Sequence, residues 1–100
     1  MTRESDIEKY LIKRVKEADG EIRKVKWIGR RGCPDRLVGF KKDTAGFGFA
    51  PIFVELKAPG KKLAAHQKRE IKKLGMLGVA TMVIDSKKQV DILVGYCTDK

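Results

Sequence analysis

Two carboxylates and one ammonium group accompany the two short apolar runs in the middle of the sequence. Asp35 directly precedes the first run, residues 36–40, whereas Glu55 and Lys57 belong to the second run, residues 52–57. Alternation along a regular strand places Glu55 and Lys57 on the same face. If the two runs pair as an antiparallel hairpin, Asp35 comes close to Glu55, so that two carboxylates and one ammonium group converge.

Such a group of three side chains suits hydrolytic chemistry. Paired carboxylates that a protein does not neutralise need a cation, and hard oxygen ligands suit Mg²⁺ or Mn²⁺. An ammonium group beside them can stabilise developing negative charge or hold an attacking water. A cluster of surface ion pairs has the same composition, so the spacing alone leaves a metal site and an ion-pair cluster both open.

The charge of the chain points to a polyanionic partner. Its 100 residues include 23 lysines and arginines against 13 aspartates and glutamates, a formal net charge of +10. Because basic residues recur along all the expected elements, the pattern favours nucleic-acid binding over a basic surface that only aids solubility. A membrane surface is disfavoured, since no expected helix pairs a broad apolar face with Trp or Phe.

Length and composition predict one small domain over residues 1–100. The chain is too short for a second hydrophobic core, and its 42% of hydrophobic residues suffices for one. No apolar stretch approaches the roughly 20 residues of a membrane span. The N-terminus lacks the layout of a secretory signal, which predicts a cytoplasmic protein. Cys33 and Cys97 form no CxxC pattern, so we expect free thiols.

Periodicity predicts the elements that position these side chains. Ser5 and Glu8 have the spacing of a capping box, and an apolar stripe at helical spacing follows over residues 7–18. β-Branched and aromatic residues predict a strand over 21–28. The two apolar runs in the middle of the chain are expected to pair antiparallel across a glycine-containing loop at 41–51.

The C-terminal half begins with a second helix, on which Gln67 heads an apolar stripe at helical spacing. Residues 79–84 are almost continuously apolar, as in a buried strand. Ser86 and Gln89 have the spacing of a further capping box, so a short terminal helix or an edge strand follows. The predicted fold is therefore α/β, an αβββαβ arrangement with a mixed sheet flanked by helices.

Several of these residues together resemble a nuclease signature. The motifs that carry the resemblance are Gly32-Cys33-Pro34-Asp35-Arg36, Phe53-Val54-Glu55-Leu56-Lys57, Gln67 and Leu74-Gly75-Met76-Leu77-Gly78-Val79-Ala80-Thr81. Their order and placement resemble the PD-(D/E)xK nuclease superfamily. More narrowly, the chain resembles a stand-alone, phage-like virus-type replication-repair nuclease (VRR-NUC) domain, whose pattern is G-x-P-D, v-E-l-K, a helical Gln and a later L-x-x-x-G-x-x-v.

The resemblance implies a restriction-endonuclease-like core and a metal-dependent phosphodiesterase. It implies that Asp35, Glu55 and the main-chain carbonyl of Leu56 hold Mg²⁺ or Mn²⁺, and that Lys57 positions or activates water. Family members also place a glutamate of the first helix near this centre. Glu8 occupies that place, although it is equally the expected capping partner of a serine three residues before it.

Gln67 is expected to point at the sheet, where a metal-bound water or Lys57 would be its partner; the alternative is a glutamine that only flanks the core. The neighbouring His66 lies about 100° further around the helix, which favours phosphate contact or plain exposure over catalysis. Cys33 occupies a variable position of its motif and is expected to pack beneath the site.

The reaction implied is hydrolysis of a DNA phosphodiester by an enzyme without a sequence-reading module. Stand-alone VRR-NUC proteins resemble dimeric junction resolvases, so Holliday-junction cleavage by a homodimer is the expected activity. Cleavage of flaps or other branched DNA is the alternative, and a catalytically silent DNA-binding module or a structural partner of a larger complex are further ones. The residues expected to contact DNA phosphates are Arg30, Arg31, Arg36, Lys61 and Lys62. The apolar candidates for an exposed dimer surface are Trp27, Phe47 and Phe49.

Overall fold

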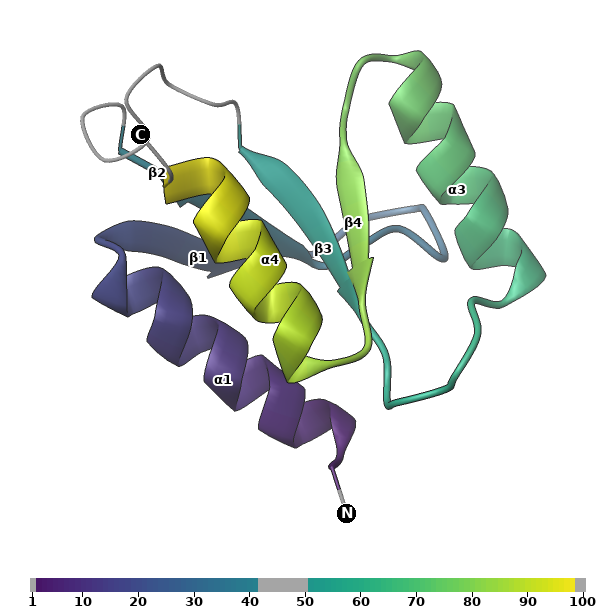
Figure 1. Ribbon diagram of the computed structural model, residues 1–100. Helices are drawn as coiled ribbons and strands as arrows, with labels where there is room; N and C mark the ends of the chain where they lie inside the picture. Colours follow the sequence, from purple (N-terminus) through teal and green to yellow (C-terminus); the bar gives the residue numbers. More distant parts are fainter. Residues whose placement is uncertain (1, 42–50, 99–100) are drawn as a thin grey trace.

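The structure, a computed structural model, describes residues 2–41 and 51–98 (Figure 1). Its elements are α1 (Glu4–Glu17), β1 (Gly20–Lys24), β2 (Arg36–Phe40), β3 (Ile52–Leu56), α3 (Ala65–Met76), β4 (Thr81–Ile84) and α4 (Lys87–Thr98). This order confirms the predicted αβββαβ arrangement. The last segment is a helix and not an edge strand.

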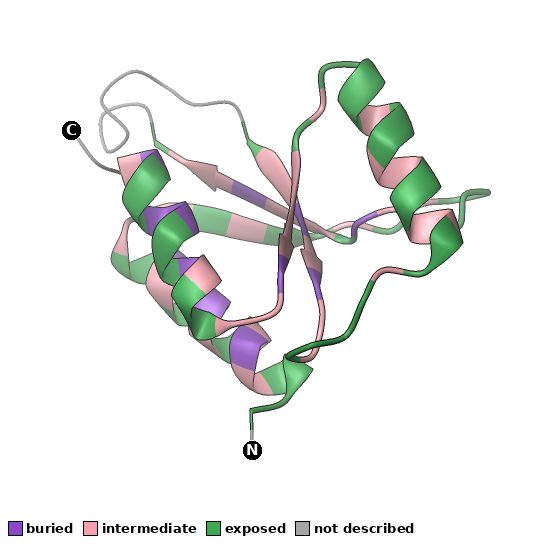
Figure 2. Cartoon of the chain, turned by 45° about the vertical axis from the view of Figure 1, so that its right-hand side comes forward, coloured by how far each residue is buried: buried purple, intermediate pink, exposed green. Residues whose placement is uncertain are grey.

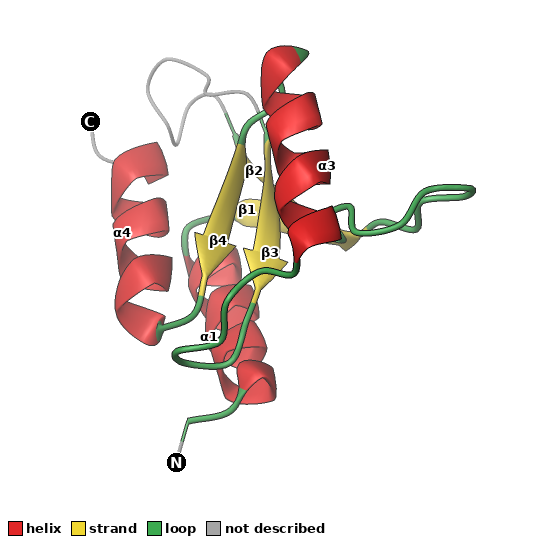
Figure 3. Cartoon of the chain, turned by 90° about the vertical axis from the view of Figure 1, so that its right-hand side faces the viewer, coloured by secondary structure: helices red, strands yellow, loops and turns green. Residues whose placement is uncertain are grey.

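The sheet has four strands in the order β1-β2-β3-β4. β1 pairs antiparallel with β2 and β2 antiparallel with β3, whereas β3 and β4 run parallel. The sheet is therefore mixed, as predicted. Figure 3 shows α1 and α4 on one face of the sheet and α3 on the other. None of the helices within the described ranges is long and apolar enough to cross a membrane.

The hydrophobic core lies between the sheet and the helices α1 and α4 (Figure 2). The predicted stripe of α1 supplies three fully buried side chains, those of Ile7, Leu11 and Val15. From the sheet, Val54 and Leu56 of β3 are buried, which confirms that one face of this strand meets the core. The side chains that alternate with them, including that of Glu55, consequently belong to the face on which α3 lies.

The helix α3 is held very differently from α1. In α3, which the structure describes throughout, no residue is buried. Figure 2 accordingly shows α3 in the colours of exposed and half-buried residues, in contrast to the buried turns of α1 and α4. Polar contacts to the preceding loop and to β3 must therefore contribute to the position of α3.

The predicted end of the first strand was wrong. β1 ends at Lys24 instead of continuing to residue 28. One more main-chain bond, from Val25 N to Asp35 O at 2.9 Å, follows the pairing with β2, and beyond it the Trp27 indole Nε1 donates to Pro34 O at 2.7 Å. The half-buried Trp27 ring packs on Phe53, with centroids 5.4 Å apart. The segment thus folds over the sheet face as a loop. Phe47, Phe49 and most of the predicted 41–51 loop lie outside the described residues.

The predicted capping box at the start of α1 was also wrong. The helix begins at Glu4, two residues earlier than a cap at Ser5 would place it, and Asp6 Oδ2 accepts a hydrogen bond from Arg3 N at 2.8 Å. Glu8 therefore does not cap α1. The predicted box at α4 is present in part, because Ser86 Oγ accepts from Gln89 N at 3.2 Å, while Gln89 Oε1 accepts from the preceding amide of Asp85 at 2.6 Å.

Candidate active site

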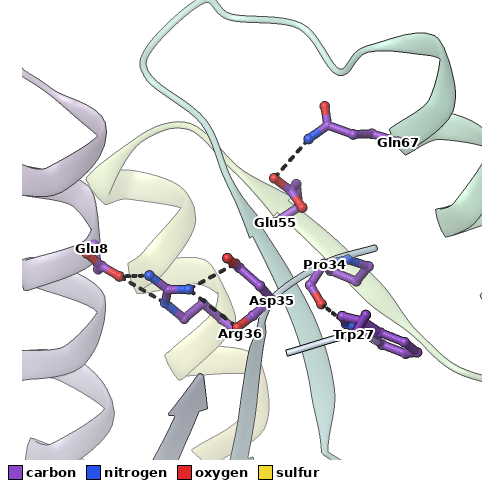
Figure 4. A network of polar contacts seen from close by, with 7 residues as sticks. All are labelled: Glu8, Trp27, Pro34, Asp35, Arg36, Glu55 and Gln67. Carbon is purple, nitrogen blue, oxygen red and sulfur yellow. Dashed lines mark hydrogen bonds and ion pairs between the residues drawn. The ribbon is translucent and has the colours of Figure 1, made fainter. Parts of the chain in front are cut away.

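The hairpin of β2 and β3 places Asp35 opposite Glu55. In the antiparallel register Arg36 faces Val54, so the next pair outward is Asp35 with Glu55. Asp35 is anchored through its carbonyl, which accepts from Val25 N at 2.9 Å. Figure 4 shows the two carboxylates next to each other at one end of the sheet. The structure thus brings together the two acidic residues that alternation and pairing predicted.

The pKa of the Glu55 carboxyl is raised by its surroundings in this site. Burial and, after it, the negative charge of Asp35 raise its pKa from 4.5 to about 6, whereas the positive charge of Lys57 opposes the shift. Two carboxylates therefore repel each other in a partly desolvated position. Such a pair binds a proton or a cation more readily than an isolated surface carboxylate would.

The pKa of Glu55 leads to a prediction about stability. Since its folded value of about 6 exceeds the ordinary 4.5, the favourable contribution present below pH 4.5 is lost as the pH rises through about 6. Glu55→Gln should therefore be more stable than wild type at pH 8 by roughly 1 kcal/mol, with little difference near pH 4. The measurement is urea unfolding in EDTA at both values, with Glu17→Gln as the exposed control. An equal difference at both pH values would contradict the assignment.

Gln67 connects α3 to the carboxylate pair. Its side-chain Nε2 donates to Glu55 Oε2 at 3.3 Å, while its Oε1 accepts from Ala64 N at 2.9 Å (Figure 4). The sequence predicted that Gln67 points at the sheet but named a metal-bound water or Lys57 as its partner. The same side chain satisfies the first turn of α3, which lacks a capping hydroxyl at Ala64. Gln67 thus fixes both the start of α3 and the carboxylate of Glu55.

Arg36 holds the acidic residues on the α1 side. Its guanidinium donates to Glu8 Oε2, with the Nε contact at 2.8 Å, and forms an ion pair with Asp35 Oδ1 at 2.9 Å. Only 14% of the Arg36 side chain is exposed. Figure 4 shows Arg36 between Glu8 and Asp35. The residue therefore bridges two carboxylates, a role that the sequence analysis missed in expecting Arg36 to contact DNA.

A signal for this role was available in the alternation of β2. Val38 of β2 is buried on the core side, and residues two apart in a strand share a face, so Arg36 had to point toward α1. On α1, Glu8 stands next to the buried Ile7 and is half-buried itself. A half-buried cation and a half-buried anion on packed elements are expected to pair.

The other residues predicted near the site differ in their exposure and in their contacts. Arg31, Lys61 and Lys62 are exposed, as DNA contacts require. Arg30, in contrast, donates through Nη2 to both carboxylate oxygens of Glu70, each at 2.9 Å. Cys33 is half-buried, and its Sγ contacts Glu70 Oε2 at 3.6 Å.

The donor set of the site suits a hard divalent cation. Asp35 and Glu55 supply carboxylate oxygens, and the main chain of Leu56 follows directly on β3. Within residues 2–41 and 51–98, no three His, Cys, Asp or Glu side chains gather as metal ligands do. Any further oxygen ligands must therefore come from the main chain, water or substrate, which Mg²⁺ commonly accepts.

Comparisons with known proteins relate the whole chain to nucleases. No protein-family model matches the chain. "Putative nuclease p44" of Acyrthosiphon pisum secondary endosymbiont phage 1 is 41% identical over 93 residues, covering 93% of this chain and 94% of that protein. A solved structure described as "VRR_NUC domain" is 33% identical with a TM-score of 0.78, covering 96% of this chain and 98% of that one. The chain belongs to the VRR-NUC family of nuclease domains.

Proposed function

We propose that this domain is a metal-dependent endonuclease that hydrolyses phosphodiester bonds in branched DNA. The observation that carries the proposal is the convergence of Asp35, Glu55 and Lys57 at one end of the sheet, with Gln67 bonded to Glu55. A formal net charge of +10 favours a polyanionic substrate. Membership of a nuclease family and similarity to a phage protein named as a nuclease support the same reaction.

In this proposal Asp35, Glu55 and the Leu56 carbonyl hold Mg²⁺ or Mn²⁺. When bound, the ion would neutralise charge on the phosphate and lower the pKa of water. Burial and, after it, the charge of Asp35 raise the pKa of Glu55, and this repulsion between two partly desolvated carboxylates supports cation binding at this position. Arg36 pairs with Asp35 as well, but Glu8 accepts two hydrogen bonds from its guanidinium, which makes Glu8 the weaker ligand candidate.

The other residues of the site position groups and supply charge. Lys57 follows directly on β3, two positions after Glu55, and the positive charge of its ammonium group lowers the pKa of that carboxyl. It is therefore placed to hold a water molecule or to stabilise charge on the phosphate. Gln67 orients the Glu55 carboxylate through its hydrogen bond to Oε2.

The homodimer in this proposal follows from the choice of a four-way junction as the substrate. Resolving a four-way junction takes two symmetric nicks, which two active sites in a C2 dimer supply. A groove of about 310 Å³ lies beside the edge strand β4, and its lining includes Ile92 and Tyr96, whose exposed fractions are 54% and 69%. An exposed apolar surface of this kind supports association with a second copy.

The test is a cleavage assay with Mg²⁺ or Mn²⁺ on end-labelled four-way junction, flap, nicked and linear duplex DNA. Wild type is compared with Glu55→Ala, and size-exclusion chromatography with light scattering reports the oligomeric state. Paired symmetric nicks in the junction that vanish in the variant are the expected result. Cutting of flaps or single strands alone would contradict junction resolution but would still support nuclease activity. DNA binding without any cleavage would support a silent binding module.

A further inference from the structure

The loop before Asp35 is docked onto α3 through its main chain. Gly32 has a φ of 83°, and a side-chain carbon added there would come within 2.6 Å of His66 Cδ2 and 3.0 Å of His66 O. Only glycine combines this backbone conformation with so close an approach. Arg30 and Cys33 strengthen the docking through their contacts with Glu70, one helical turn beyond His66.

This docking encloses a polar pocket outside the carboxylate centre. The pocket has a volume of about 360 Å³, and we call it the Arg31–Arg69 pocket. Its lining residues are Gly29, Arg30, Arg31, His66, Arg69 and Glu70. Arg31 and Arg69 are both exposed, so the pocket opens to solvent.

The charges in the pocket do not cancel. Arg30 engages both oxygens of Glu70, whose side chain is only 15% exposed, and this pair neutralises the one carboxylate of the lining. Arg31 and Arg69 form no ion pair with any residue in the described part of the chain. Two guanidinium groups therefore remain available for an anion, and planar guanidinium groups suit phosphate oxygens.

Shared and neighbouring residues connect the pocket with the candidate active site. His66 of the pocket is the neighbour of Gln67, which bonds Glu55. A second cavity, of about 530 Å³, is lined by Asp35 and shares Arg30 with the Arg31–Arg69 pocket. An extended anion that reaches the carboxylates can therefore follow one surface from Asp35 past Arg30 to Arg69.

We propose that the Arg31–Arg69 pocket binds a backbone phosphate of the DNA strand, neighbouring the phosphate that is cleaved. Arg31 and Arg69 contact the phosphate, and Arg30 with Glu70 keeps the loop and α3 in place around it. This inference rests on the proposed function, because its ligand is the proposed substrate. It adds Arg69 to the expected DNA contacts and changes the role of Arg30 from contacting DNA to positioning.

The first test measures DNA binding in EDTA, so that no cleavage occurs. Fluorescence anisotropy with a labelled four-way junction gives the dissociation constant over a range of salt concentrations for wild type, Arg31→Ala and Arg69→Ala. Each variant should bind about 3- to 10-fold more weakly and should lower the slope of log K against log salt by about 0.9. The control Lys16→Ala removes an exposed charge from α1, on the other face of the sheet.

The second test locates the phosphate. Single methylphosphonates, which remove one phosphate charge, are placed along the strand on either side of the cleaved bond. A methylphosphonate at one position should weaken DNA binding by wild type but should not weaken binding by Arg69→Ala any further. The control Lys16→Ala should lose as much affinity at this position as wild type does. Thermal unfolding checks folding, and Arg31→Gln or Arg69→Gln, which removes the charge but keeps the Cβ and Cγ methylenes, replaces the alanine variant at the same residue if that variant fails to fold.

Several outcomes separate this inference from the proposed function. If the salt slopes of both arginine variants match that of Lys16→Ala, the pocket does not bind DNA phosphate, even if wild type cuts DNA. If no methylphosphonate position loses its effect in Arg69→Ala, the assignment is overturned as well. Reduced salt slopes in the arginine variants together with no cleavage by wild type would support phosphate binding by the pocket and would overturn the proposed nuclease function.

Discussion

Asp35→Asn is expected to reduce DNA cleavage by at least about 10³-fold, equivalent to about 4 kcal/mol of lost transition-state stabilisation. The substitution removes one of the two negative charges proposed to hold the metal ion while keeping the size of the side chain. Because the Asp35 side chain is 52% exposed and Arg36 retains its contacts with Glu8, the fold should be preserved. Single-turnover cleavage of the preferred DNA and thermal unfolding measure the two effects.

The control for this variant is Asp19→Asn. Asp19 is exposed, lies after α1 and has a φ of 59°, a conformation that asparagine adopts readily. It should cut DNA at the wild-type rate. In wild type, Mn²⁺ should raise the melting temperature, and Asp35→Asn should lose this rise. Cleavage by Asp35→Asn at a rate near that of wild type would overturn the site.

The same variant should also change the titration of Glu55. The charge of Asp35 contributes to the raised pKa of Glu55, so its removal should lower that pKa toward 4.5. Carboxyl ¹³C NMR of the metal-free protein measures this directly. The stabilisation contributed by a protonated Glu55 would then be lost at a lower pH than in wild type.

The features predicted correctly from the sequence depend on local periodicity. The stripe of Ile7, Leu11 and Val15 has the period of a helix, and Val54 and Leu56 have that of a strand with one buried face. Pairing of two neighbouring strands then fixes which residues lie opposite each other. The proximity of Asp35 and Glu55 follows from these short-range rules alone.

The features that the sequence analysis missed depend on contacts between distant segments. The end of β1 is determined by the Trp27 indole bond to Pro34 and by packing on Phe53, neither of which a strand propensity reports. Arg30 meets Glu70 across 40 positions in the sequence. A run of basic residues indicates only that charge is present. The packed structure was needed to separate the half-buried Arg36, which bridges two carboxylates, from arginines free to contact DNA.

The start of α1 illustrates competition between two local solutions. Both Asp6 and Glu8 stand where an acidic side chain can cap a helix, depending on whether the helix begins at Glu4 or near Ser5. The helix begins at Glu4, and Asp6 takes the capping bond. This leaves the carboxylate of Glu8 available for Arg36, which links α1 to the active-site end of β2.

The second large effect is expected from Lys57→Met, which should lower cleavage by about 10²- to 10⁴-fold. Lys57 follows directly on β3, where its main-chain N donates to Ile84 O at 2.9 Å, so the side chain starts from a fixed point. Methionine keeps much of the length and flexibility but removes the charge. DNA affinity should change by less than about tenfold, because many other basic residues are available to contact the DNA phosphates.

The direction of the Glu55 shift distinguishes Lys57→Met from Asp35→Asn. The charge of Lys57 lowers the pKa of Glu55, so without it that pKa should rise above about 6, opposite to the effect of Asp35→Asn. Carboxyl ¹³C NMR of Glu55 measures the shift, and Lys88→Met, an exposed residue of α4, is the control. A variant with a raised Glu55 pKa and full cleavage would mean that Lys57 acts only as a structural counter-charge. A variant with no cleavage and an unchanged Glu55 pKa would place its ammonium group on the DNA phosphate and away from the carboxylates.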